Sequence, residues 1–272
     1  MSKKTRPRNF AVISIISGFG NNLFQLSAAH EMEKRGFRVM FDVSNVKKRR
    51  LEICEIPEIY EYIRPRILEV SRFMPSIIGK HSRLMRLILK HLFGITLWID
   101  MTSFGYLPVQ TKQNYLISGY WQRLSVAKNL PEISYFQRPI VPRKVALHVR
   151  RGDMVSNVER PLDAYFRSCV LRIMKENQGA DLSFFVYTDD PDYCLNNLDI
   201  GVAFHVILGA STLDDFAGLI ESQYLVLSRS SFSWWAGFFS KGTVYAPSPW
   251  NESIVQDEDL IYPRDWMILN CN

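Results

Sequence analysis

The sequence lacks several features that would assign it to a common class of protein. It contains no run of about 18 apolar residues, so it offers no candidate for a transmembrane helix. Its few cysteines are widely scattered and show no C-x-x-C or metal-ligand spacing: Cys54, Cys169, Cys194 and Cys271. This usage predicts neither a disulfide framework nor a zinc site and favours a reduced compartment, so we expect a cytoplasmic protein.

Two signatures of common enzyme classes are also absent. No G-x-x-x-x-G-K-[ST] occurs, which leaves P-loop phosphoryl transfer without support. No G-x-S-x-G occurs, which leaves a serine nucleophile without support. The chemistry therefore has to be carried by other motifs.

The composition predicts an enzyme-sized globular chain with two compact halves, because the 272 residues are 47% hydrophobic and 22% charged. Lys and Arg number 33 against 27 Asp and Glu, which gives a net charge of +6 and favours anionic partners. The basic residues are dispersed and no nucleic-acid recognition module is visible. We therefore expect no nucleic-acid partner.

Two segments resemble membrane-directed sequences. A basic N-terminus precedes the apolar run 10–16, as in a signal peptide, but a glycine- and asparagine-rich turn follows in place of a small-residue cleavage site. We interpret this run as a buried first strand. Residues 77–93 alternate apolar and basic side chains at helical spacing, which indicates either a membrane-surface helix or a core-facing helix with a solvated basic face. Peripheral contact with the cytoplasmic face of a membrane therefore stays an alternative.

The order of elements predicts two α/β halves with doubly wound parallel sheets, which bind ligands at the carboxyl ends of their strands. The aperiodic, proline-containing stretch 131–142 marks their connection, and we place the boundary between residues 138 and 139. The first half is expected to hold strands at 10–16, 38–42 and 115–118, a helix at 21–35 and a mostly helical stretch at 47–106. The second is expected to hold strands at 145–149, 182–187, 204–207, 224–227 and 243–246, with helices at 163–177, 213–222 and 232–240.

The first strand is followed by a glycine-containing helix start, S-G-F-G-N-N at residues 17–22. Gly20 and Asn21 lie where a ligand could approach backbone N–H groups at the positive end of a helix. The turn is not a G-x-G-x-x-G fingerprint, since Leu23 replaces the third glycine. Tight packing explains the glycines equally well.

Positive charge follows the strand at 145–149 directly. His148, Arg150, Arg151 and Asp153 share this loop. Two guanidiniums at a strand end suit a phosphate or diphosphate, because arginine offers a fixed fork of donors and keeps its charge. In the alternative interpretation, one arginine pairs with Asp153 and the other is solvated.

Two further clusters follow strands of the second half. Asp189 and Asp190 could accept hydrogen bonds from ribose hydroxyls or a guanine edge, or could cap a helix. Asp190 also begins a D-x-D, the pattern of metal-dependent sugar transferases. In the segment S-S-F-S-W-W, Ser230, Ser231 and Phe232 could hold a phosphate and a base at a helix start, whereas the tryptophans fit a core equally well.

Together these clusters resemble, in order and spacing, the glycosyltransferase family 11 alpha-1,2-fucosyltransferases. The similarity rests on S-G-F-G-N-N-L-F-Q at 17–25, G-Y-W-Q at 119–122, H-V-R-R-G-D at 148–153, T-D-D at 188–190 and S-S-F-S-W-W at 230–235. The sequence departs from the family pattern at Ser17, Asn22 and Thr188, and it is only weakly similar over 47–113.

The resemblance implies a GT-B fold, in which two Rossmann-like doubly wound domains face each other across a cleft. Residues 1–138 would form the acceptor side, and 139–272 would bind GDP-fucose. It also implies inverting transfer of L-fucose to the 2-hydroxyl of a terminal galactose, without a required metal or other cofactor, so D-x-D becomes a turn. The acceptor would be a glycan, lipid-linked in one alternative, used in bacterial surface-polysaccharide assembly such as lipopolysaccharide O-antigen synthesis.

By the same resemblance, Arg150 would bind the departing diphosphate with His148 in support, and Arg151 would lie beside it. Asp189 or Asp190 would contact guanine or ribose. Ser230, Ser231 and Phe232 would hold phosphate and base, and Gly20 with Asn21 would meet the fucose. The general base is expected to be Asp153, ahead of Glu159. Two alternatives stay open: a GT-B transferase that uses another sugar nucleotide, and a non-catalytic nucleotide- or glycan-binding relative.

Overall fold

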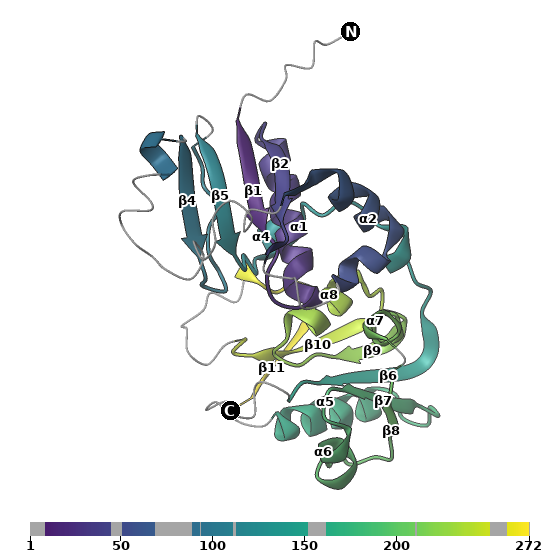
Figure 1. Cartoon of the computed structure of the whole chain (residues 1–272). Coiled ribbons are helices and arrows are strands. Elements are labelled where there is room, and N and C mark those ends of the chain that lie inside the picture. The colour runs from purple at the N-terminus through teal and green to yellow at the C-terminus, as the bar shows by residue number, and fades with distance from the viewer. Residues whose placement is uncertain are drawn as a thin grey trace. The chain divides into compact units, whose positions relative to one another are not determined.

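The computed structural model describes residues 9–44, 51–68, 89–92, 94–110, 113–151, 162–209, 211–250 and 260–271. The chain divides into two compact units, Met1–Glu132 and Ile133–Asn272, so the boundary lies six residues before the predicted one (138 − 132 = 6). Figure 1 labels their helices and strands. Among the described residues, no helix is both long enough and apolar enough to cross a membrane.

The first unit is built on a five-stranded parallel sheet with the strand order β3-β2-β1-β5-β4. Its strands are β1 Phe10–Ser14, β2 Arg38–Asp42, β3 Ile67–Leu68, β4 Ile95–Asp100 and β5 Asn114–Gly119. Its helices are α1 Phe19–Lys34, α2 Pro57–Ile63 and α4 Leu124–Ala127, with 3-10 turns η2 Glu52–Glu55 and η3 Arg64–Arg66. The expectation of a mostly helical stretch at 47–106 is therefore wrong for β3 and β4.

Helix α1 connects β1 to β2; it begins two residues before the predicted helix 21–35 and ends one residue before its predicted end. Gly36 has a φ of +91°, a left-handed conformation that glycine adopts without strain. The amide of Phe37 returns to the carbonyl of Met32 at 3.1 Å, which satisfies a carbonyl at the helix end. The helix thus ends at Lys34, and the chain reverses direction and enters β2 at Arg38, parallel to β1.

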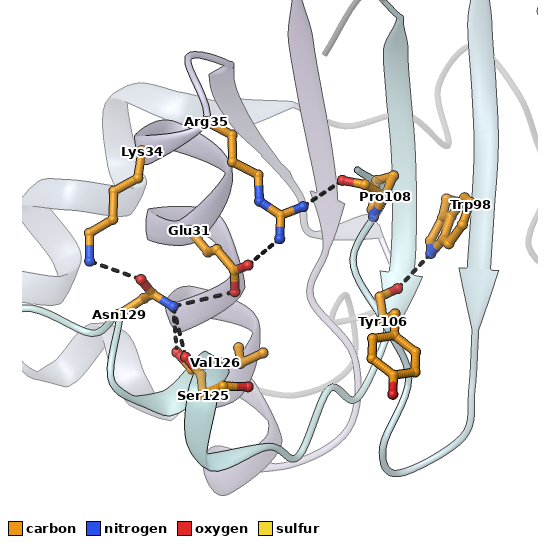
Figure 2. A network of polar contacts seen from close by, with 9 residues as sticks. All are labelled: Glu31, Lys34, Arg35, Trp98, Tyr106, Pro108, Ser125, Val126 and Asn129. Atoms are coloured by element: carbon orange, nitrogen blue, oxygen red, sulfur yellow. Dashed lines mark hydrogen bonds and ion pairs between the residues drawn. The ribbon is translucent and has the colours of Figure 1, made fainter. Parts of the chain in front are cut away.

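The connection from β4 to β5 contains no helix in its described part, 101–110, and is fixed by polar contacts from its neighbours (Figure 2). The Trp98 indole donates to the Tyr106 carbonyl at 2.8 Å, and Arg35, the C-cap residue of α1, donates to the Pro108 carbonyl at 2.6 Å. Arg35 also pairs with Glu31, whose other oxygen accepts from Asn129 at 3.3 Å. These hydrogen bonds hold the connection between β4 and β5 in place, as the packing of a crossover helix does in other parallel sheets.

The second unit contains a six-stranded parallel sheet with the order β11-β10-β9-β6-β7-β8. Its strands are β6 Val141–Val149, β7 Ser183–Thr188, β8 His205–Ile207, β9 Ser222–Val226, β10 Thr243–Ser248 and β11 Met267–Asn270. Its helices are α5 Asp163–Glu176, α6 Pro191–Asn196, α7 Thr212–Ile220 and α8 Ser231–Phe239, with the 3-10 turn η5 Ser134–Phe136. The sequence predicted this alternation but missed α6 and β11.

The side chains of β6 alternate between the two faces of the second sheet. Val145, Leu147 and Val149 belong to a buried cluster that includes five residues of α5. His148 points to the other face, where its ring centroid lies 5.3 Å from that of Phe232 in α8. Helices therefore cover both faces, as the doubly wound prediction requires (Figure 1).

Gly119, the first residue of the G-Y-W-Q motif, is expected to be required by packing. A Cβ atom there would lie 2.4 Å from the Asp100 carbonyl oxygen and 2.8 Å from the Trp121 ring. We expect Gly119→Ala to lower the free energy of unfolding by about 1–3 kcal/mol, measured by urea denaturation, because backbone and a buried indole cannot both move away. Gly18→Ala is the control, since a Cβ at Gly18 has no neighbour within 4 Å, and its expected cost is below about 1 kcal/mol. Equal costs for the two variants would refute this account.

Candidate functional site

The predicted residues of the second half follow the ends of neighbouring parallel strands. β6 lies between β7 and β9 in the sheet, so the segments that follow these three strands meet at one edge. In the register, Val149 is paired with Thr188, and Leu147 with Val226. Two described residues after β6, two after β7 and the stretch leading into α8 after β9 are thereby brought together: Arg150, Arg151, Asp189, Asp190 and Ser228–Ser231.

Asp189 links the two arginines. One carboxylate oxygen forms an ion pair with Nη1 of Arg150 at 2.7 Å, and the other accepts a hydrogen bond from the backbone N–H of Arg151 at 2.8 Å. The side chains of Arg150 and Asp189 are 39% and 26% exposed, so the guanidinium is oriented by the protein yet still reachable from solvent. Asp153, the partner in the alternative interpretation, lies outside the described residues.

Arg151 is held by protein groups on two sides. Its Nε lies 3.4 Å from an oxygen of Asp190, and its guanidinium lies 3.3 Å from the centroid of the Tyr193 ring. Asp190 is the N-cap of α6 and accepts from the N–H of Tyr193 at 3.1 Å, as the helix-cap alternative predicted. The residues of the D-x-D pattern therefore begin a helix, and the described part of the chain contains no group of three or more metal-ligating side chains.

His148 is buried and bonded to protein. Its Nδ1 lies 2.7 Å from the hydroxyl of Ser228. Burial lowers the pKa of His148 to about 4; the positive charge of Arg150 acts in the same direction and Asp189 opposes it. The imidazole is therefore neutral at pH 7 and adds no charge beside the arginine.

The serines around the start of α8 differ in what they contact. Ser230 caps the helix and accepts from the N–H of Phe232 at 3.3 Å, and Ser231 is the first helical residue. Ser228 and Ser233 are buried, with their hydroxyls directed at protein groups. Trp234 and Trp235 are buried completely, so they form core, as the alternative for them predicted.

In the first unit, Gly20 and Asn21 lie in the first turn of α1, beyond the carboxyl end of β1. The Asn21 side-chain oxygen accepts from the amide of Gln122 at 2.8 Å, which joins this turn to the segment after β5. Ser17, which stands where the family motif has glycine, has a φ of +64°. Its hydroxyl donates to the hydroxyl of Tyr120 at 3.3 Å.

Comparison with known proteins places these features in a family. A sequence model of glycosyl transferase family 11 matches residues 99–270. An alpha-1,2-colitosyltransferase of Escherichia coli is 32% identical over 138 residues, which cover 45% of this chain and 46% of that enzyme. The chain thus matches about half the length of this curated relative.

Solved structures show the fold. The protein FUT1 of Arabidopsis thaliana, solved as a point variant in complex with GDP, superposes with a TM-score of 0.51 at 10% identity, covering 97% of this chain and 77% of that one. The heptosyltransferase WaaC of Escherichia coli with ADP gives a TM-score of 0.49 at 12% identity, covering 96% and 92%. The likeness to FUT1 and the two parallel-sheet units confirm the predicted GT-B fold.

The depressed pKa of His148 predicts a loss of stability in mild acid. An unfolded histidine has a pKa of about 6.5, so between about pH 6.5 and pH 4 the unfolded chain binds more protons and the free energy of unfolding falls as pH falls. We expect His148→Gln, which cannot titrate, to lose about 1–2 kcal/mol less than wild type between pH 7 and pH 5 in urea denaturation. Equal losses would contradict the buried, neutral state of this ring.

Proposed function

Since the chain belongs to glycosyl transferase family 11, we propose that it transfers L-fucose with inversion from GDP-fucose to the 2-hydroxyl of a terminal galactose in a glycan. The single observation that carries this proposal is the family match over 99–270, which contains both the arginine pair and the start of α8. The alpha-1,2 linkage in the name of the relative and the GDP bound to FUT1 support the linkage and the nucleotide.

In this proposal Arg150 binds the diphosphate of the donor. As the bond to fucose breaks, negative charge grows on the departing GDP, and an oriented guanidinium stabilises that charge without having to reorganise. The accessible side chain at the end of β6 and its ion pair with Asp189 support this role. The contacts of Arg151 with Asp190 and Tyr193 support a secondary role for the second arginine.

The remaining donor contacts are proposed from placement. Ser230, Ser231 and Phe232 begin α8, whose first N–H groups and positive end suit a phosphate, and the Phe232 ring suits a base. Asp189 is engaged with Arg150 and Arg151, which favours an orienting role for it over the predicted contact with guanine or ribose. Asp190, as the cap of α6, is the weaker candidate for that contact.

Groups of the first unit are proposed for the fucose and the acceptor. Gly20 and Asn21, with Gln122 beside them, supply N–H groups and amides suited to sugar hydroxyls. The predicted general base, Asp153, and its alternative, Glu159, lie outside the described residues. We further propose a metal-free reaction in a cytoplasmic protein that acts in surface-polysaccharide assembly.

Colitosyl transfer is the second candidate, because the relative from Escherichia coli is a colitosyltransferase. Colitose is L-fucose without its 3-hydroxyl, so the two donors differ in one hydrogen-bonding group. A site that bonds this hydroxyl would reject the deoxy sugar strongly, whereas a site with an apolar contact there would discriminate only weakly.

We expect the purified protein to release GDP and form a fucoside when GDP-fucose and a panel of beta-galactosides are supplied in the presence of EDTA. GDP should raise the melting temperature more than UDP or CDP, since a GDP-sugar transferase is expected to bind guanine in preference to a pyrimidine. Faster turnover of GDP-colitose than of GDP-fucose would select the second candidate. No transfer with any donor, together with no binding of GDP, would refute the proposed function.

We expect Arg150→Ala to lower kcat/KM for the donor by about 100-fold, because it removes a charge aligned with the leaving group. Arg150→Lys should recover only part of the loss, since an ammonium lacks the fork geometry. Arg172→Ala is the control: this exposed arginine of α5 pairs with Glu176 four residues on and should leave the rate unchanged. A donor kcat/KM within threefold of wild type for Arg150→Ala would remove Arg150 from the mechanism.

A further inference from the structure

A chain of buried hydroxyls connects His148 to the start of α8. The hydroxyl of Ser228 lies 2.7 Å from Nδ1 of His148 and 3.4 Å from the hydroxyl of Ser233. The Ser233 hydroxyl in turn lies 3.2 Å from the carbonyl oxygens of Ser228 and Ser230. The three side chains come from the end of β6, the segment after β9 and the first turn of α8.

Because these hydroxyls are buried, losing one of their hydrogen bonds is costly. Ser228 is 1% exposed and Ser233 is fully buried, so neither hydroxyl has ready access to water. Ser233 has one proton and carbonyl acceptors for it, which leaves its oxygen able to accept from Ser228. Removing the Ser228 hydroxyl would leave a buried imidazole nitrogen without this partner, which is costly at a buried site.

The Ser228 hydroxyl lies between the two elements proposed to hold the diphosphate. His148 and Arg150 are two residues apart at the end of β6, so fixing the ring also fixes the backbone from which Arg150 departs. On the other side, the N–H of Ser230 donates to the carbonyl of Ser228 at 2.8 Å, and Ser230 caps α8. Ser228 therefore contacts both segments: its hydroxyl lies within hydrogen-bond distance of His148 and of Ser233 in α8, and its carbonyl accepts from Ser230.

We propose that Ser228 is a positioning residue for nucleotide diphosphate binding, which holds Arg150 and the N-terminus of α8 in register through its hydrogen bond to His148. This inference rests on the proposed function, because that function supplies the diphosphate. It differs from the sequence interpretation, in which serine hydroxyls of this segment contact phosphate directly. The side chain of Ser228 contacts no ligand and acts through its protein partners.

Three variants and a matched control test the role. Ser228→Ala removes the hydroxyl, Ser228→Thr retains it, and Ser228→Cys keeps nearly the same volume with a weaker donor should the alanine variant fail to fold. The control is Ser222→Ala at the other end of β9: Ser222 is also fully buried, but its hydroxyl donates to the carbonyl of Gly218 at 2.9 Å. Both alanine variants lose one buried hydroxyl, and only one loses it beside His148.

Three quantities are measured for each variant: the GDP affinity by calorimetry, the KM values for donor and acceptor, and the imidazole ¹⁵N shifts of His148 by NMR. We expect Ser228→Ala or Ser228→Cys to weaken GDP binding by about tenfold, the scale of one lost buried hydrogen bond, with the acceptor KM unchanged. The imidazole ¹⁵N shifts of His148 should differ from those of wild type. Their pH dependence should then be governed by burial and by the charged neighbours that remain, Arg150 and Asp189. Ser228→Thr should bind GDP within about threefold of wild type, and Ser222→Ala within about twofold, since both keep the His148 contact.

Wild-type affinity for GDP in the alanine or cysteine variant would overturn the inference. So would an equal loss of affinity in Ser222→Ala, because general destabilisation would then explain both. Unchanged His148 shifts in Ser228→Ala would show that the hydrogen bond does not act on the ring. A wild-type protein that binds no GDP contradicts the proposed function itself, whereas GDP binding that is insensitive to Ser228 contradicts this inference alone.

Discussion

The parallel pairing of β6 with β7 on one side and β9 on the other is the constraint on which the site depends. It brings Arg150, Asp189 and Ser228 to one edge although they are far apart in the sequence. A slip of one residue in β6 would turn His148 into the apolar cluster against α5 and direct Val149 toward α8. Val145, Leu147 and Val149 occupy every second position of this strand and pack in the core. They therefore fix both the register of the strand and the direction in which the candidate site residues point.

Charge at this edge is distributed unequally. The Arg151 side chain contacts the Asp190 carboxylate and the Tyr193 ring, whereas the Arg150 side chain forms an oriented ion pair with Asp189 and is 39% exposed. The neighbouring His148 stays neutral because it is buried, so it adds no positive charge to that of the two guanidiniums. A ligand with two negative charges would meet the Arg150 guanidinium already oriented by Asp189, so binding would cost little conformational entropy of that side chain.

The sequence predicted the second unit well because β-branched runs alternate there with amphipathic helices between clear turn signals. It failed at β4, where the segment I-T-L-W-I-D is half-buried except at the exposed Trp98 and shows no regular alternation of apolar and polar residues. It also missed α6, although the cap at Asp190 and the following proline are helix-start signals. Both misses are short elements whose stability comes from their neighbours rather than from their own pattern.

The proximity of the candidate residues could be predicted from the sequence, but the bonds between them could not. Polar clusters at strand ends made Arg150 and His148 candidates, because parallel topology brings such ends together. Which carboxylate pairs with Arg150, and whether a serine faces a ligand or the core, depends on the packing of distant segments. Ser228 and Ser230 look equivalent in the sequence, yet one bonds a buried imidazole and the other caps a helix.

The turn after β1 shows how a similar motif acquires a different chemistry. In a dinucleotide-binding turn, glycines leave the backbone open to a pyrophosphate, whereas here side-chain amides bond to the backbone at the end of β1. Gln25 accepts from the N–H of Ile16 at 3.1 Å, and Asn22 donates to the carbonyl of Ile16 at 2.9 Å. Leu23, in place of the third glycine, is completely buried. The two amides thus satisfy the backbone N–H and C=O of Ile16, and the side chain of Asn21 bonds to Gln122. Side-chain amides therefore fix the conformation of this turn, a role that glycines have in a dinucleotide-binding turn.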